Sequence, residues 1–257
     1  MALQVLWLIL ALLGSFLSGS IPFAVLIGKM ATGKDLRNYN VGNPGGFNAV
    51  MTYGLAIGLS VIFIDILKGF LPMMAIDLIF KQAAWGFGID TVWYKLAVIL
   101  GPAFCILGHN HSPWLKFKGG RGSAVFIGTL IWVNPLVLIC YFFPFGIMIG
   151  LFKVPTRVST VLSAIFYLPA ALFLPIAPLW SRHMLTTMVY PATGQFIYLL
   201  PFLIALEMWL AQLPRHIPSL IAALRGEEWT LKVGEGQQFS EKLDTIKAKA
   251  TKEEKEE

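Results

Sequence analysis

Long apolar stretches limit the folds open to this chain more than any other feature of its sequence. They recur from residue 3 to residue 213, and each is close to the roughly 20 residues that a helix needs to cross the core of a bilayer. Hydrophobic residues make up 56% of the chain and charged residues only 13%, whereas about 25% of a soluble domain is charged. We therefore predict an all-α, polytopic transmembrane helix bundle rather than a soluble domain.

The apolar stretches divide into about seven predicted spans. They cover residues 3–27, 54–80, 92–108, 123–134, 135–152, 158–178 and 194–213. The fourth and fifth separate at Asn134-Pro135, because the residue before a proline is pushed out of the helical region; without this break the count is six. The first stretch lacks a preceding basic residue and a convincing cleavage site, so we expect a helix and not a signal peptide. The membrane domain then covers residues 1–213 and a charged tail covers residues 214–257.

The lysines and arginines of the loops predict how the bundle is oriented, because cytoplasmic loops carry an excess of these residues. With seven spans the loops fall into two alternating sets. One set holds Lys29, Lys34, Arg37, Lys116, Lys118, Arg121, Lys153 and Arg157, and the other holds Lys81, Lys95 and Arg182. We expect the larger set to face the cytoplasm, with the N-terminus outside and the tail inside.

Several function classes find no support in the sequence. It has no Walker loop, no zinc-ligand spacing and no H-E-x-x-H motif, so neither a metal site nor a nucleotide-binding loop is predicted. Its basic residues are not interleaved with aromatic residues in a soluble module, so nucleic acid is not an expected partner. Cys105 and Cys140 lie in apolar stretches and are expected to be free packing residues.

A glycine-rich cationic loop, Lys116 to Gly122, stands directly before the fourth span. Gly119, Gly120 and Gly122 would let the backbone approach an anion closely, Arg121 adds a fixed charge, and the next helix offers its N-terminal end. The loop therefore predicts a phosphate-binding site at the membrane surface. Just before it, His109 is a candidate general base or hydrogen-bond donor, unless it simply lies at the level of the lipid head groups.

The first predicted cytoplasmic loop, from Lys29 to Tyr53, is the longest and most polar. It contains Arg37 and a run of residues that tolerate unusual backbone angles, among them Gly42, Asn43 and Asn48. Asparagine amides and an arginine suit hydroxyl and phosphate groups, which favours a binding role. The alternative is a turn-rich connector without chemistry.

Some polar residues within or beside the predicted spans have both a structural and a functional interpretation. Ser20 lies in Ser-Gly-Ser-Ile-Pro and either packs helices closely or serves a site. Asp65 and Lys68 are three residues apart on one helix face and are predicted to pair, with Lys68 also a candidate for binding a substrate. Ser159, beside the third cytoplasmic loop, is a weak candidate on its own.

The order of these pieces resembles one family, the membrane acyl-phosphate:glycerol-3-phosphate acyltransferases, or PlsY family. The matching segments, spread over roughly residues 15 to 228, are residues 19–23, 35–37, 42–45 with Asn48, 65–69, 108–109 with 117–122, 158–159, and His216 with 226–228. The Asp65 to Gly69 segment fits the family's D-x-x-K-G, and the Phe117 to Gly122 segment fits its G-G-K-G motif. In each case the residues also follow one another in the family's order.

The chain departs from the family pattern at several positions. Asn40 and Val41 replace a glycine and a serine, Gly46 and Phe47 replace an alanine and a threonine, and Met51 stands where an arginine belongs. Arg121 replaces the lysine of G-G-K-G, and Ser219 stands at the place of an asparagine. Arg121 keeps the charge and can bind phosphate with two parallel hydrogen bonds. The other changes leave a catalytically inactive or substrate-shifted homologue as an alternative.

The resemblance implies transfer of a fatty acyl group from acyl phosphate to the sn-1 hydroxyl of glycerol 3-phosphate, giving lysophosphatidic acid at the cytoplasmic face of a bacterial plasma membrane. It implies His216, His109 and Ser20 as catalytic candidates and no metal or organic cofactor. The expected substrate-binding residues are Arg37, Gly42, Asn43, Asn48, Lys68, Gly119, Gly120, Arg121, Gly122 and Ser159. A transporter is a further alternative, although the polar residues gather at one membrane face rather than at the midplane.

Overall fold

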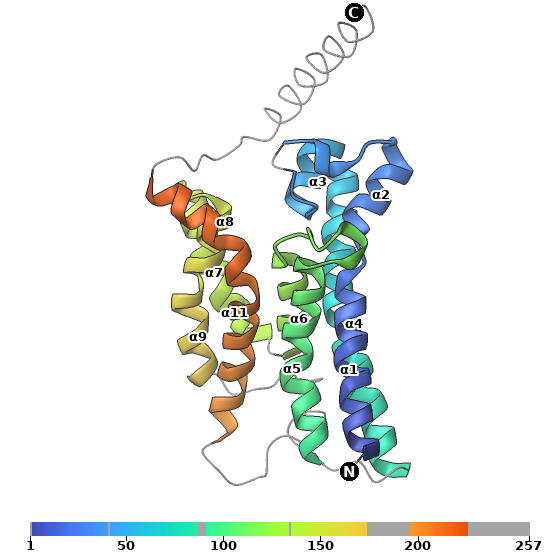
Figure 1. Ribbon diagram of the computed structural model, residues 1–257. Coiled ribbons are helices and arrows are strands. Elements are labelled where there is room, and N and C mark those ends of the chain that lie inside the picture. The colour runs from blue at the N-terminus through green and yellow to red at the C-terminus, as the bar shows by residue number, and fades with distance from the viewer. Residues whose placement is uncertain (1, 41, 87–90, 134, 174–195, 226–257) are drawn as a thin grey trace, which may run out of the picture. The chain divides into compact units, whose positions relative to one another are not determined.

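Helices form all the regular structure in the part of the chain that the computed structural model describes, residues 2–40, 42–86, 91–133, 135–173 and 196–225 (Figure 1). The α-helices are α1 (Ala2–Ser20), α2 (Phe23–Thr32), α3 (Gly46–Tyr53), α4 (Leu55–Gly86), α5 (Thr91–Asn110), α6 (Ser123–Val133), α7 (Pro135–Gly150), α8 (Thr156–Leu162), α9 (Ala164–Phe173) and α11 (Phe196–Leu224). Two short 3-10 helices, η1 (Leu36–Asn38) and η2 (Pro113–Leu115), lie in the loops. The predicted all-α class is confirmed.

Three described segments are long and apolar enough to cross a membrane: Ala2–Thr32, Leu55–Ile76 and Val92–Leu115. They coincide with the first three predicted spans. Shorter apolar helices cover Ser123–Trp132, Leu136–Gly150 and Thr156–Leu172. Parts of the last two predicted spans, residues 174–178 and 194–195, lie outside the described residues, as does Arg182.

The structure breaks some spans that the sequence predicted as continuous. The first is interrupted at Pro22, where α1 ends and α2 begins, because proline cannot donate a backbone hydrogen bond. The sixth is divided at Ser163 into α8 and α9. The predicted break between the fourth and fifth spans agrees with the end of α6 at Val133 and the start of α7 at Pro135; Asn134 itself is outside the described residues.

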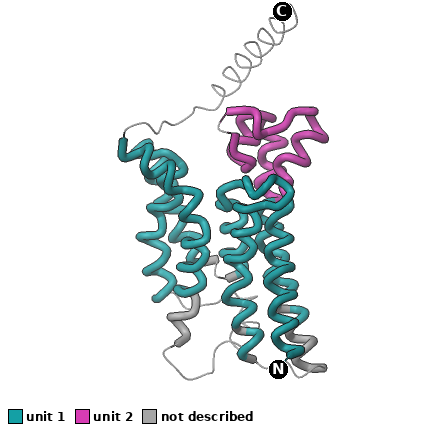
Figure 2. Tube along the Cα trace, viewed as in Figure 1, with its two compact units in different colours: residues 1–21, 65–229 teal, residues 22–64, 230–257 magenta. Residues whose placement is uncertain are grey.

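The chain forms two compact units (Figure 2). Unit 1 comprises residues 1–21 and 65–229, and unit 2 comprises residues 22–64 and 230–257. One boundary falls at the break between α1 and α2, and another falls inside α4. The predicted first cytoplasmic loop, residues 29–53, therefore lies wholly within unit 2.

Close helix packing in unit 1 depends on glycines that face a neighbouring backbone. A side chain at Gly19 of α1 would overlap the Cys105 carbonyl of α5, and one at Gly108 of α5 would overlap the Phe16 carbonyl of α1. Gly69 of α4 and Gly128 of α6 face the Val125 and Ile66 carbonyls in the same reciprocal way. Small residues let helix backbones approach closely. In a membrane this close packing, and not the hydrophobic effect, drives the association of helices.

A second group of helices in unit 1 packs around aromatic side chains. Helix α11 contacts α5, α6, α8 and α9, and α7 contacts α6, α8 and α9. Phe126, Tyr141 and Tyr167 meet with ring centroids 5.5 to 5.8 Å apart. This separation is typical of stabilising aromatic pairs, and these contacts hold α6, α7 and α9 against one another.

Unit 2 is small and has its own core of Ala24, Leu36, Ala49 and Val61. It contains helix α3, which the sequence analysis missed because the segment reads as a glycine- and asparagine-rich connector. A side chain at Gly46 would overlap Ile62, and one at Gly58 would overlap Val50. These two tight contacts hold α3 against the start of α4.

Candidate active site

The cationic glycine loop is anchored on the end of α5. The Gly119 N–H donates to the Asn110 carbonyl at 3.2 Å, and the Gly120 N–H donates to the His109 carbonyl at 3.1 Å. Carbonyls in the last turn of a helix have no partner within the helix, so the loop supplies partners for two of them. A side chain at Gly120 would overlap the His109 ring, which explains why glycine is needed there.

This anchoring changes which groups of the loop remain to bind an anion. The N–H groups of Gly119 and Gly120 already donate to α5, so these glycines hold the loop in place. Gly122 has a φ of +81°, a conformation that glycine adopts without strain, and it turns the chain into α6. Arg121 and the first turn of α6 are therefore the better candidates for contacting a phosphate.

Arg215 of α11 also holds the glycine loop in place. Its Nη2 donates to the Phe117 carbonyl at 3.0 Å and, at shorter range, to the Asn110 carbonyl. Asn110 Nδ2 in turn donates to the Ala211 carbonyl of α11 at 3.0 Å. The sequence analysis gave Arg215 no site role, and its position next to His216 was the signal that could have identified it.

Ser20 is buried at the end of α1, and its contacts fix its position. Its Oγ donates to the Leu17 carbonyl at 2.7 Å and accepts from the Trp114 indole at 3.0 Å. Ser112 Oγ donates to the Ser20 carbonyl at 2.6 Å. These bonds tie η2, which directly precedes the glycine loop, to the break between α1 and α2.

Lys68 lies next to the same break. Its Nζ is 2.8 Å from Asp65 Oδ1 and donates to the Ile21 carbonyl at 2.8 Å. That carbonyl is available because the helix is interrupted at Pro22. The predicted pairing of Asp65 and Lys68 is confirmed, and both side chains are almost fully buried.

His216 of α11 is 1% exposed. Its Nδ1 lies 3.2 Å from the Arg157 carbonyl oxygen at the start of α8, and Arg121 is close to the ring as well. Ser159 is on the same helix as Arg157, and its Oγ donates to the Pro155 carbonyl at 3.1 Å. His216 thus adjoins the glycine loop through Arg121, whereas Ser159 mainly stabilises the start of α8.

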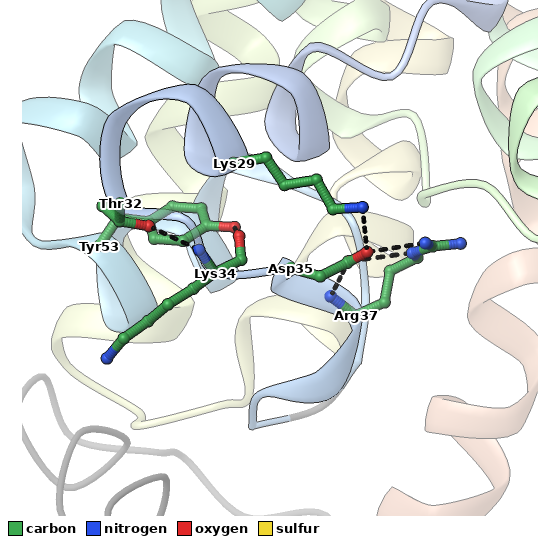
Figure 3. A network of polar contacts seen from close by, with 6 residues as sticks. All are labelled: Lys29, Thr32, Lys34, Asp35, Arg37 and Tyr53. Carbon is green, nitrogen blue, oxygen red and sulfur yellow. Dashed lines mark hydrogen bonds and ion pairs between the residues drawn. The ribbon is translucent and has the colours of Figure 1, made fainter.

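Unit 2 holds the remaining candidate residues. Arg37 Nε and Nη2 donate to the two oxygens of Asp35 at 3.0 and 2.7 Å, and Lys29 Nζ is 3.1 Å from Asp35 Oδ2 (Figure 3). The Arg37 side chain hydrogen bonds hold the pKa of Asp35 well below its usual range, against the opposing effect of burial. The same carboxylate raises the pKa of Arg37. Arg37 remains partly exposed, with its charge held in place.

The asparagines of unit 2 build the loop. Asn48 Nδ2 donates to the Leu36, Tyr39 and Asn43 carbonyls at 3.0 to 3.3 Å, and Asn48 Oδ1 accepts from Asn40 at 3.0 Å. Gly42 has a φ of +64°, a left-handed conformation that favours glycine. The bonding groups of Asn48 are therefore engaged in shaping the segment that carries Arg37.

Three of the positions at which the chain departs from the motifs, Gly46, Met51 and Ser219, are buried, whereas Phe47 is exposed. Met51, at the place of the missing arginine, is 2% exposed and contributes to the packing of α3. Ser219 is buried on α11, and Gly46 packs against Ile62. Val41 lies outside the described residues. Across the described ranges, no group of three His, Cys, Asp or Glu side chains could hold a metal ion.

Two relatives of known name resemble this sequence. The glycerol-3-phosphate acyltransferase of Acholeplasma laidlawii is 34% identical over 137 residues, which are 53% of this chain and 58% of that protein. The enzyme of the same name from Chlorobium phaeobacteroides is 34% identical over 168 residues, 65% of this chain and 68% of that protein. The matched region thus spans less than two thirds of the first relative and slightly more than two thirds of the second.

The fold has solved counterparts. A crystal structure of PlsY, an integral membrane glycerol 3-phosphate acyltransferase, in its glycerol 3-phosphate form has a TM-score of 0.62 to this chain and 26% sequence identity; the match covers 89% of this chain and 97% of that one. The lysophosphatidic acid form of PlsY has a TM-score of 0.59 and 25% identity. These likenesses support a membrane protein and an acyltransferase enzyme. Because the glycerol-3-phosphate acyltransferase family model matches residues 9–223, this chain belongs to that family, as its motifs predicted.

Proposed function

We propose that this protein transfers a fatty acyl group from acyl phosphate to the sn-1 hydroxyl of glycerol 3-phosphate, giving lysophosphatidic acid and inorganic phosphate. The hydroxyl oxygen forms a bond to the acyl carbonyl carbon, and the bond from that carbon to the phosphate oxygen breaks. The electron pair of the broken bond leaves with the phosphate. The hydroxyl proton passes to a base or to the departing phosphate, so the reaction needs no cofactor.

The observation that carries this proposal is the cationic glycine loop, held by α5 on one side and by Arg215 on the other. It presents Arg121 beside the first turn of α6, and both features favour a phosphate group. The PlsY structures named for glycerol 3-phosphate and lysophosphatidic acid support the same substrate and product. Arg37 and Lys68 are the candidates for a second anionic group.

Acyl phosphate is already activated, so positioning supplies much of the proposed catalysis. Holding the hydroxyl against the carbonyl can remove several kcal/mol from the barrier, and nearby cations stabilise the oxyanion that develops. Ser20 Oγ is buried and already bonded to Leu17 and Trp114, which favours a positioning role over attack on the acyl group. His216 is the first candidate for the base and His109 is the second.

The remaining binding candidates divide by what their polar groups do in the structure. Asn48 and Gly42 shape the loop that carries Arg37 and Asn43, while Gly119, Gly120 and Gly122 shape the loop that carries Arg121. Ser159 stabilises the start of α8 near His216. We propose that these residues contribute to substrate binding indirectly, by fixing the backbone of the two loops and of the start of α8.

The proposed setting is a bacterial plasma membrane with seven spans, the N-terminus outside and the site facing the cytoplasm. The acyl tail would lie among the membrane helices, and both phosphates would meet the cationic loops. The net charge of +6 would favour anionic substrates and lipid head groups at that surface.

The decisive experiment uses the full chain purified into lipid nanodiscs, with radiolabelled glycerol 3-phosphate and palmitoyl phosphate. We expect labelled lysophosphatidic acid, and hydrolytic mapping should place the acyl group at sn-1. Palmitoyl-CoA and palmitoyl-acyl carrier protein are the donor controls. A folded sample that binds glycerol 3-phosphate without turnover would instead identify an inactive homologue. Uptake into proteoliposomes without acylation would identify a transporter.

Arg121 provides the matched test of the loop. Arg121→Ala should raise the KM for a phosphorylated substrate about 10- to 100-fold, because one charge-assisted hydrogen bond is worth roughly 1.5–3 kcal/mol. Arg121→Lys should recover part of the loss, since it keeps the charge. Lys153→Ala, which removes an exposed cation bonded only to the nearby Gly150 carbonyl in the described structure, is the control. Equal kinetics for Arg121→Ala and the wild type would exclude the proposed contact.

A further inference from the structure

A small cavity lies beside His216 within unit 1. It has a volume of about 10 Å³, and its walls come from α6, α7, α8, α9 and α11. A cavity of about 10–15 Å³ is just large enough to hold one water molecule. Among its lining side chains are Tyr141, Thr160, Trp209, Gln212 and His216.

Three of the residues that line this cavity each have a polar side-chain atom without a hydrogen-bond partner within the described part of the chain. These atoms are Trp209 Nε1, Gln212 Oε1 and His216 Nε2, and all three are buried. Gln212 is 4% exposed and lies one helical turn before His216 on α11. Buried polar atoms are nearly always paired with protein or with ordered water, so the three together call for a shared partner.

The hydrogen bond on the other side of the ring determines what His216 Nε2 can do. Nδ1 lies 3.2 Å from the Arg157 carbonyl oxygen, and a carbonyl oxygen can only accept. Nδ1 therefore carries the proton, and in a neutral imidazole Nε2 is then an acceptor. The unpaired atoms of the lining residues are therefore two acceptors, His216 Nε2 and Gln212 Oε1, and one donor, the Trp209 indole N–H. The Thr160 hydroxyl, which also belongs to the lining, already donates to the Thr156 carbonyl.

We propose that this cavity holds one ordered water molecule, and that Gln212 is a positioning residue that acts on His216 through it. The water donates one hydrogen to His216 Nε2 and the other to Gln212 Oε1, and it accepts from Trp209 Nε1–H. A single water satisfies all three atoms, and buried waters typically make about three such bonds. The arrangement fixes the Nδ1–H tautomer and keeps the Nε2 lone pair ready to accept a proton.

The catalytic consequence rests on the proposed function, in which His216 is the first candidate for the base. In that role the water accepts the proton of the substrate hydroxyl and passes one of its own protons to His216 Nε2. Gln212 then affects the chemical step and not the binding of the phosphates. The tautomer and the water site themselves do not depend on which reaction the protein catalyses.

Nitrogen-15 NMR of histidine-labelled protein in nanodiscs tests the structural part directly. The chain has four histidines, and a His216→Asn variant assigns the His216 signals by their loss. We expect a protonated Nδ1 and an unprotonated, hydrogen-bonded Nε2. Gln212→Met, which keeps the side-chain length but removes the oxygen, should shift Nε2 towards the position of a nitrogen without a hydrogen bond. Gln4→Met, the same substitution on α1, should leave the His216 signals unchanged.

Two NMR outcomes would overturn the proposal. A protonated Nε2 would show that the ring donates there, for instance towards the nearby Arg121 main chain. An Nε2 signal that is the same in the wild type and in Gln212→Met would show that Gln212 does not act on it. A crystal structure that resolves water provides an independent measurement, and an empty cavity beside His216 would also contradict the water site.

Kinetics tests the catalytic part separately. Gln212→Met should lower kcat about tenfold, less than the roughly 10²- to 10⁴-fold effect of losing the acid–base group itself, because His216 remains. The KM for glycerol 3-phosphate should stay within about twofold of the wild type. Gln212→Glu restores an acceptor oxygen and should recover part of kcat. An unchanged kcat in Gln212→Met would remove the positioning role. If the wild type has no acyltransferase activity, the proposed function fails while the NMR result still decides the water site.

Discussion

Lys68 satisfies two buried acceptors with one ammonium group, the Asp65 carboxylate and the Ile21 carbonyl. Lys68→Met would leave the Asp65 charge unpaired in a buried position. Breaking a buried ion pair in this way typically costs about 3–5 kcal/mol. We therefore expect a large fall in the thermal unfolding temperature, measured in detergent by the fluorescence of the native tryptophans.

The double variant Asp65→Asn with Lys68→Met is the control for this prediction. It removes both charges, so it should recover part of the stability that Lys68→Met loses. Equal unfolding temperatures for the single and double variants would mean that the lost bond to the Ile21 carbonyl, and not the stranded carboxylate, causes the effect.

Asp35 predicts a pH dependence in unit 2. Its pKa is lowered, chiefly by the side-chain hydrogen bonds of Arg37. A carboxyl group with a lower pKa in the folded state stabilises that state above its unfolded pKa of about 3.9, and the contribution disappears as the pH falls towards the folded value. Asp35→Asn should therefore be less stable than the wild type at pH 7, and the difference should narrow below about pH 4. A constant difference from pH 7 to pH 3 would contradict the assignment.

Two glycines of α1 distinguish the effect of close packing on stability from the effect of helix propensity. A side chain at Gly19 of α1 would overlap the Cys105 carbonyl, whereas at Gly14 nothing lies within 4 Å. Gly19→Ala should lower stability by about 1–3 kcal/mol, the usual cost of overpacking. Gly14→Ala should leave stability unchanged or raise it by up to about 1 kcal/mol. Equal unfolding temperatures for the two variants would show that α1 and α5 are less tightly packed than the structure indicates.

Arg215 joins α11 to the glycine loop, so its loss should act on the loop as an element. Arg215→Ala should increase amide hydrogen exchange over residues 117–122 and lower acyltransferase activity about 10- to 100-fold, the range expected when a charged donor to two carbonyls is removed. Arg215→Lys should recover only part of this, because lysine lacks the planar fork of arginine. Arg225→Ala, at the exposed end of the same helix, is the matched control. Unchanged amide hydrogen exchange over residues 117–122 would show that Arg215 does not hold the loop in place.

The elements that the sequence predicted well are those whose signal is local. The first three spans follow from apolar length alone, and the pair of Asp65 and Lys68 follows from a spacing of three residues. Helix α3 was missed because its sequence favours turns. Its stability comes from contacts with α4, such as that between Gly46 and Ile62, which no local pattern reveals.

In the candidate site, too, local features could be predicted from the sequence and long-range contacts could not. The glycine loop and His216 could be identified from residue type and order. The bonds that hold them join residues far apart in the chain: Trp114 to Ser20, 94 residues away, and Arg215 to Phe117, 98 residues away. Such contacts depend on how the helices pack, so the supporting roles of Trp114 and Arg215 appear only in the structure.

At the scale of the whole molecule, the distribution of loop cations predicts the topology. Residue 34 precedes the second predicted span in the chain and residue 92 follows it, so the two should face opposite sides of the membrane, with residue 34 in the cytoplasm. Residue 225 follows α11. With seven spans it shares the side of residue 34, because six spans separate the two positions, and with six spans it lies on the opposite side.

Cysteine labelling distinguishes these topologies. In a background with Cys105 and Cys140 replaced by alanine, Lys34→Cys, Val92→Cys and Arg225→Cys each introduce one thiol at a position outside the core. An impermeant maleimide should label residues 34 and 225 only in inside-out vesicles and residue 92 only in right-side-out vesicles. Labelling of residue 225 from the side of residue 92 would instead mean six spans. Labelling of residue 34 from outside would reverse the orientation and separate the cationic loops from substrates made in the cytoplasm.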